Sequence, residues 1–147
     1  MGAIVCATRG GQGSRAAQLQ AIKEAKETGE RLVFLYVVDI NSIGYFKEAL
    51  APAIRAELRW LGRALLHIAR QRAEQEGLQA KIVLREGNVK DEIEAFLQEC
   101  RASLLLLGAP RDTTRTVFGD DAIEKFAHEV EVDTGLPVRV VRPEEVP

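Results

Sequence analysis

The stretch SLLLLGAPRDTTRTVFGDDAIEKF, residues 103–126, decides how the rest of the chain is interpreted. Its four leucines, Leu104–Leu107, are too few to cross a membrane and suit a short strand that is buried on both faces. Gly108 ends that run, a polar loop follows, and a helical pattern begins near Asp121. A buried strand that leads through a loop into a helix is an arrangement in which α/β proteins bind ligands.

Strand-like and helix-like segments alternate along the whole chain. Besides the leucine run, apolar segments rich in strand-forming residues occupy residues 3–8, 31–38, 81–85 and 137–141. Helical patterns lie at residues 14–28, within 45–76, from 88 onward and from 121 to about 134. Residues expected to cap these helices or to stand in their first turns are Ser14, Pro52, Asn88 and Asp121. Residues 39–44 are expected to form a loop. The alternation predicts a parallel sheet sandwiched between helices.

The composition is that of one globular domain covering residues 1–147 without a linker. A formal net charge of −2 gives no general attraction to nucleic acid or to anionic membranes. No apolar run approaches the roughly 18 residues of a membrane span, and the N-terminal residues lack the pattern of a signal peptide. We therefore expect a cytoplasmic protein in which Cys6 and Cys100 are buried, unpaired thiols.

The loop after the first strand suits an anion. It offers three glycines, backbone N–H groups at a helix start, the Ser14 hydroxyl and the guanidinium groups of Arg9 and Arg15. A flexible turn followed by a serine cap explains the same residues, and neither a dinucleotide fingerprint nor a P-loop motif is present. The candidate binding residues here are Thr8, Arg9, Gly10, Gly11, Gly13 and Ser14.

The loop after the leucine strand has a mixed charge. If the strand order is 3-2-1-4-5, this loop meets the first one at a crevice, and Arg111 and Arg115 could reach the same anion. Asp120 and Asp121 would repel a phosphate unless a cation such as Mg²⁺ lay between them. The two carboxylates are equally explained as caps of the following helix.

Other chemistry is poorly supported by the sequence. His67 and His128 lack the neighbouring cysteines or paired histidines of a metal site. Neither Ser14 nor Ser103 has the setting of a catalytic nucleophile. We therefore expect no catalytic residues and no bound metal. Trp60 lies beside the apolar stripe of the long helix and either completes the core or meets another subunit.

The order and spacing of these segments resemble the universal stress protein family. The similarity is carried by IVCAT at 4–8, LVFLYVVD at 32–39, VLREGNVKDEI at 83–93, LLLLGAP at 104–110, and AIEKF at 122–126 followed by LPVRVVRP at 136–143. The resemblance implies a single-domain, doubly wound, three-layer sandwich of the flavodoxin-like or adenine nucleotide alpha hydrolase-like type. Its five parallel strands would have the order 3-2-1-4-5.

The resemblance also implies a homodimer. Members of the family commonly pair through the fifth strand, which here contains Val138, Arg139, Val140 and Val141. An apolar edge strand tends to pair with another chain, and pairing with a copy of itself would cover it.

Many members of the family bind ATP through two motifs, and this sequence departs from both. The aspartate expected after the first strand is Arg9. In the G-x-x-G, nine residues, G-S/T motif after the fourth strand, Gly108 is retained and the second glycine is Arg111. The closing pair falls on Asp120-Asp121, with Gly119 as a displaced glycine. Losing a glycine that admits phosphate, and adding two carboxylates, should weaken triphosphate binding.

The adenine side of the family's pocket is intact in this sequence. The resemblance places it at Val37, Asp39 and Val89. A nucleoside, or a smaller phosphate held by Arg9 and Arg111, is therefore still compatible with the residues present.

We therefore expect a homodimeric regulatory or ligand-sensing module of the universal stress type, without enzymatic activity and without the tight ATP binding usual in the family. Two alternatives remain open. One is an adenine-nucleotide-binding protein, or a weak ATPase, in which arginine-rich loops and an aspartate-held metal replace the glycine cradle. The other is a purely structural dimerisation module. No cofactor is assigned; ATP with Mg²⁺ enters through the family resemblance alone.

Overall fold

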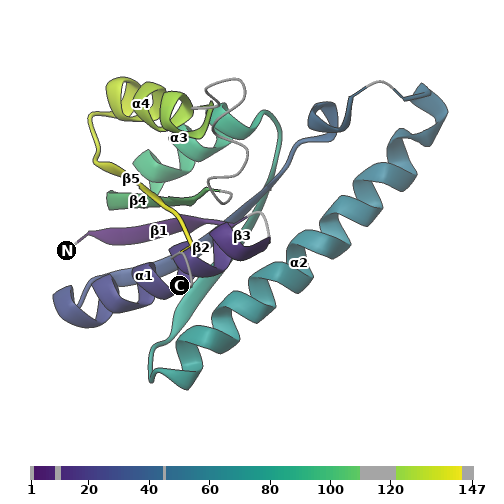
Figure 1. Ribbon diagram of the computed structural model, residues 1–147. Helices are drawn as coiled ribbons and strands as arrows, with labels where there is room; N and C mark the ends of the chain where they lie inside the picture. The colour runs from purple at the N-terminus through teal and green to yellow at the C-terminus, as the bar shows by residue number, and fades with distance from the viewer. Residues whose placement is uncertain (1, 9–10, 45, 110–121, 144–147) are drawn as a thin grey trace.

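The computed structural model describes residues 2–8, 11–44, 46–109 and 122–143 (Figure 1). Its strands are β1 (Ala3–Ala7), β2 (Arg31–Val38), β3 (Ala80–Glu86), β4 (Ala102–Gly108) and β5 (Val138–Val141). Its helices are α1 (Gly11–Thr28), α2 (Ala51–Gln75), α3 (Val89–Glu99) and α4 (Ala122–Thr134), with short 3₁₀ helices η1 (Ile40–Ile43) and η2 (Glu48–Leu50) before α2.

The five strands form one parallel sheet in the order β3-β2-β1-β4-β5, as expected. Helices α1 and α2 cover one face, and α3 and α4 cover the other (Figure 1). Side chains alternate between two apolar cores, so Cys6 and Phe34 pack with α1 and α2 while Val5 and Leu35 pack with α3 and α4. This double burial explains why the central strands are continuous apolar runs.

The helix starts differ from the sequence prediction in two places. Ser14 was expected to cap α1, but the helix begins at Gly11 and Ser14 lies buried within its first turns. Glycine tolerates a helical backbone at a cost of only about 1 kcal/mol. We attribute the earlier start to tertiary packing, which includes the bond between buried Gln18 and the end of β1. Residues 40–43, expected as loop, form η1, which Asp39 caps by accepting a 3.0 Å hydrogen bond from the backbone N of Asn41.

Other boundaries agree closely with the prediction. Pro52 stands in the first turn of α2, and the side chain of Asn88 caps α3 by accepting a 3.1 Å bond from the N of Asp91. The expected cap of α4, Asp121, lies outside the described residues. Cys6 is buried and Cys100 partly buried, and both are free thiols. Within the described ranges, no helix is long and apolar enough to span a membrane.

Helix α2 approaches the sheet closely at Gly62. A Cβ atom added there would lie 2.5 Å from Cδ1 of Tyr36 and 2.9 Å from Cδ1 of Leu84. The buried residues of α2 are Gly62, Leu66, Ala69 and Ala73, which run from the middle of the helix toward its C-terminus. The N-terminal part of α2 extends away from the sheet (Figure 1). The helix is therefore anchored by its middle and its C-terminal turns.

Candidate functional site

The carboxyl ends of the parallel strands meet at one edge of the sheet, where a ligand is expected. Thr8 follows β1 there and donates its backbone N–H to the carbonyl of Leu35 over 2.8 Å. Eight of the predicted site residues are described: Thr8, Gly11, Gly13, Ser14, Val37, Asp39, Val89 and Gly108. Six lie outside the described residues: Arg9, Gly10, Arg111, Gly119, Asp120 and Asp121.

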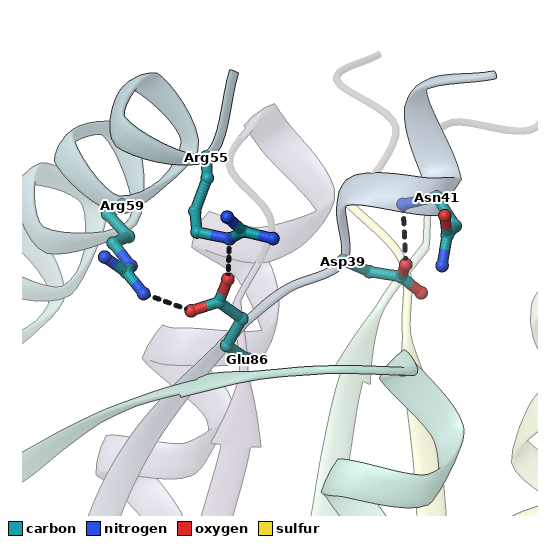
Figure 2. A network of polar contacts seen from close by, with 5 residues as sticks. All are labelled: Asp39, Asn41, Arg55, Arg59 and Glu86. Atoms are coloured by element: carbon teal, nitrogen blue, oxygen red, sulfur yellow. Dashed lines mark hydrogen bonds and ion pairs between the residues drawn. The ribbon is translucent and has the colours of Figure 1, made fainter. Parts of the chain in front are cut away.

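The adenine side of the predicted site is assembled around Asp39. Its Oδ1 accepts the hydrogen bond from Asn41, drawn in Figure 2, and its Oδ2 accepts a 3.2 Å bond from the backbone N of Val89. The N–H of Gly87 also donates to the carbonyl of Val38 over 2.9 Å. Val37 and Val89 both pack against the core on the α3 side. The end of β2 and the start of α3 are thus joined through one carboxylate.

The first predicted anion loop is partly helical. Gly11 and Gly13 belong to α1, so their backbone does not form the loose glycine turn considered from the sequence. Ser14 is only 5% exposed. The side chain of Ser14 is therefore largely shielded from solvent, and its role in ligand binding stays a prediction.

A buried polar chain that the sequence did not predict lies beneath this edge. Nε2 of Gln18 donates to the hydroxyl of Thr8 over 2.7 Å, and Oε1 of Gln18 accepts from Nη1 of Arg72 over 2.5 Å. Burial lowers the pKa of Arg72, and the nearby charge of Arg15 lowers it further. The available signal was the polar Gln18 between Ala17 and Ala21 on the inner stripe of α1.

A second unpredicted cluster lies where β3 ends. Arg55 and Arg59, one turn apart on α2, both bind the carboxylate of Glu86: Nε of Arg55 donates to Oε1 and Nη2 of Arg59 to Oε2 (Figure 2). The hydrogen bond from Arg59 is the first cause of a lowered pKa at Glu86, and the bond from Arg55 lowers it further. The signal in the sequence was an arginine pair at i and i+4 together with an acidic residue at the end of a strand.

No metal centre is found among the described residues, where no group of three or more His, Cys, Asp or Glu could hold an ion. His67 instead shares a 2.8 Å hydrogen bond with Arg70, its neighbour one turn along α2. The aspartate pair considered as a metal site from the sequence lies outside the described residues.

The predicted dimer strand β5 forms one edge of the sheet. Val138, Val140 and Val141 are partly buried, whereas Arg139 is exposed. Nη1 of Arg139 lies 2.5 Å from Oε1 of Glu24 in α1, and this hydrogen bond lowers the pKa of Glu24. The backbone N of Val138 donates to Oε1 of Glu131 over 3.3 Å. Side chains of the same chain therefore hold β5 in place.

Comparison with known proteins gives a consistent family assignment. The model of the Universal stress protein family matches residues 1–134. A universal stress family protein from Burkholderia pseudomallei is 27% identical, with a TM-score of 0.69 over 97% of this chain and 96% of that chain. No curated protein matches the sequence.

More distant structures share the fold. The universal stress protein UspA from Lactobacillus plantarum is 21% identical, with a TM-score of 0.73 over 97% of each chain. A universal stress family protein from Arabidopsis thaliana, solved with AMP bound, is 15% identical, with a TM-score of 0.67 over 98% of this chain and 93% of that chain. Two further universal stress proteins with this fold were solved in complex with cAMP and with dAMP.

Proposed function

The chain belongs to the universal stress protein family, and we propose that it is a non-enzymatic sensor of an adenine nucleoside or of an adenine nucleotide with a short phosphate group. Relatives with the same fold hold AMP, cAMP and dAMP. The observation that carries the proposal is the arrangement of Asp39, whose carboxylate is held by the backbone N–H groups of Asn41 and Val89 at the carboxyl edge of the sheet.

The phosphate side supports a short phosphate group rather than a triphosphate. Arg9 and Arg111 replace the aspartate and the second glycine of the family's motifs, and Asp120-Asp121 replaces its closing pair. Carboxylates near a phosphate chain repel it, and each added phosphate increases that repulsion. Affinity should therefore decrease from AMP to ATP.

We further propose that the sensor is a homodimer joined through β5. The support is the position of β5 at the sheet edge together with the three valines in its four residues. Such an edge would otherwise stay open to uncontrolled pairing.

The test is thermal unfolding with adenosine, AMP and ATP–Mg²⁺, with guanosine as the matched control for the base. A ligand at 100 times its Kd stabilises the folded state by about 2.7 kcal/mol. We expect Tm to rise with adenosine or AMP, less with ATP–Mg²⁺, and not with guanosine. A larger dose-dependent rise with ATP–Mg²⁺ than with AMP would contradict the proposal.

A pair of variants locates the site. Asp39→Ala removes the carboxylate that fixes η1 and the start of α3, and should abolish the rise with adenosine. Asp91→Ala, which removes an exposed carboxylate from the first turn of α3, should leave that rise intact. Equal losses in the two variants would contradict a site at Asp39.

A further inference from the structure

The cluster of Arg55, Arg59 and Glu86 carries more positive charge than its own carboxylate can neutralise. Two guanidinium groups meet one carboxylate, so the three side chains together hold one positive charge in excess. Two like charges one turn apart on a helix also oppose each other. Their side chains are 39% and 45% exposed, so an anion in solution can reach them.

The cluster lies at the edge of the sheet where the proposed ligand binds. Glu86 pairs with Val38 in the β2–β3 ladder, and Val38 directly precedes Asp39. Figure 2 shows the outer edge of the Arg55 guanidinium turned away from Glu86, on the side where Asp39 is drawn. The positive charge therefore lies at the end of β3, the strand next to β2, which Asp39 follows.

The two arginines have donors to spare. A guanidinium group carries five N–H donors in a planar fork, and each arginine makes a single hydrogen bond to Glu86. Glu86 holds both forks at the end of β3 and so reduces the ordering that an incoming anion would have to impose. Arginine forks of this kind suit the oxygens of phosphate and carboxylate.

The cluster differs from Arg85, the arginine that precedes Glu86 on β3. Arg85 projects to the opposite face, where Nε lies 2.8 Å from Glu92 and Nη1 lies 2.8 Å from Glu99, both in α3. Two carboxylates surround that one guanidinium group. The excess positive charge is therefore confined to the α2 side of β3.

We propose that Arg55 and Arg59 form an anion-binding subsite that takes a phosphate group, with Glu86 as the resident carboxylate that positions them and competes with the incoming anion. The inference goes beyond the proposed function, because it adds an anion site on α2 to the phosphate side that was proposed at Arg9 and Arg111. A simple tether of α2 to β3 is the competing explanation of the same contacts.

The two explanations predict different effects of Glu86→Gln on pyrophosphate binding. In a tether, Glu86→Gln only loosens α2. In the subsite, Glu86→Gln removes the competing charge and should tighten binding of inorganic pyrophosphate by up to about fivefold, the usual range for an exposed ion pair. Arg55→Gln combined with Arg59→Gln should weaken that binding about tenfold or more.

The experiment is titration of pyrophosphate and, separately, of adenosine, into wild type and variants at low salt. Arg70→Gln is the matched control, because Arg70 lies on the same helix, pairs with Glu74 at 3.7 Å and is remote from the sheet edge. It should leave pyrophosphate binding unchanged. Unfolding curves of each variant establish that it is folded before its affinity is compared.

Each result is decisive. Tighter binding in Glu86→Gln together with weaker binding in the double arginine variant supports the subsite. Pyrophosphate binding that is absent from wild type, unchanged in the double variant or weakened in Glu86→Gln overturns it. Adenosine carries no anionic group. If wild type binds pyrophosphate as expected but does not bind adenosine, the proposed function is overturned and the subsite is still supported.

Discussion

Gln18 of α1 donates a 2.7 Å hydrogen bond to the hydroxyl of Thr8 at the end of β1, and both residues are at most 3% exposed. Because Arg72 can only donate, its bond to Oε1 of Gln18 fixes the amide orientation and makes Thr8 the acceptor. One buried side chain thus connects a strand end with two helices.

Replacing Gln18 by leucine should destabilise the protein. Thr8 and Arg72 would both lose their partner in the interior, at a cost of about 1–3 kcal/mol. Urea denaturation measures the change. Gln71→Leu, at an exposed position of α2, is the control and should change the free energy of unfolding by less than about 0.5 kcal/mol. Equal effects at the two positions would contradict a stabilising role for the hydrogen bonds of Gln18.

Replacing Gly62 by alanine should also destabilise, although alanine favours helix formation by roughly 1 kcal/mol. The new Cβ would meet the buried ring of Tyr36 at 2.5 Å, and overpacking of this kind costs about 1–3 kcal/mol. The exposed substitution Ala56→Gly, on the same helix, measures the propensity contribution alone. A rise in Tm for Gly62→Ala would show that α2 is free to shift.

The carboxyl of Glu94 should make stability depend on pH. Burial, followed by the neighbouring Asp133, raises its pKa, and its Oε2 is buried without a hydrogen-bond partner among the described residues. Below the ordinary value near 4.5 the group is protonated in both the folded and unfolded states. As pH rises above that value, the unfolded chain loses this proton more readily than the folded protein, so the free energy of unfolding falls until pH has passed the raised folded pKa.

The side chain in Glu94→Gln cannot ionise, so this variant should have a higher Tm than wild type at neutral pH. The difference in Tm between the two proteins should narrow as pH falls to about 4. Thermal unfolding across this range tests the sign. Glu57→Gln, on an exposed part of α2, reports the general effect of removing one carboxylate. A difference that widens toward acid pH would contradict the raised pKa.

The proposed dimer can be tested at Val140. The carbonyls of Pro137 and Val141 accept bonds from Leu105 of β4 and from Ala109 just after it, so the two-residue alternation of a strand directs the N–H of Val140 to the open edge. Val140→Pro removes that donor and should yield a folded monomer by light scattering. Val140→Thr keeps the N–H and should remain dimeric. A monomeric wild type would remove the basis of this prediction.

The sequence was sufficient for the architecture because the signals there are local and repeated. The leucine run, the Asn88 cap and the alternation of segments each depend on neighbours in the chain. Ser14 was misassigned because serine before a helical pattern favours a cap, whereas its burial within α1 is decided by residues distant in sequence. The position of the helix start therefore needed the tertiary structure.

The candidate site was predicted less completely, for a related reason. Asp39 and Val89 were named through the family resemblance, and the structure brings them together. Arg55, Arg59 and Glu86 were missed because residues 27 and 31 positions apart become neighbours only when α2 returns along β3. Charged residues on a helix are ordinary by composition, and only their convergence on one carboxylate distinguishes them.

The carboxylate of Asp39 also has a kinetic consequence. It accepts the amide hydrogens of Asn41 and Val89, two residues at the ends of segments where backbone N–H groups usually exchange quickly with solvent. These two amides should exchange slowly and at similar rates, because both become exposed when the Asp39 carboxylate moves away and its two hydrogen bonds break. The rim of the sheet would then open as a single unit rather than fray residue by residue.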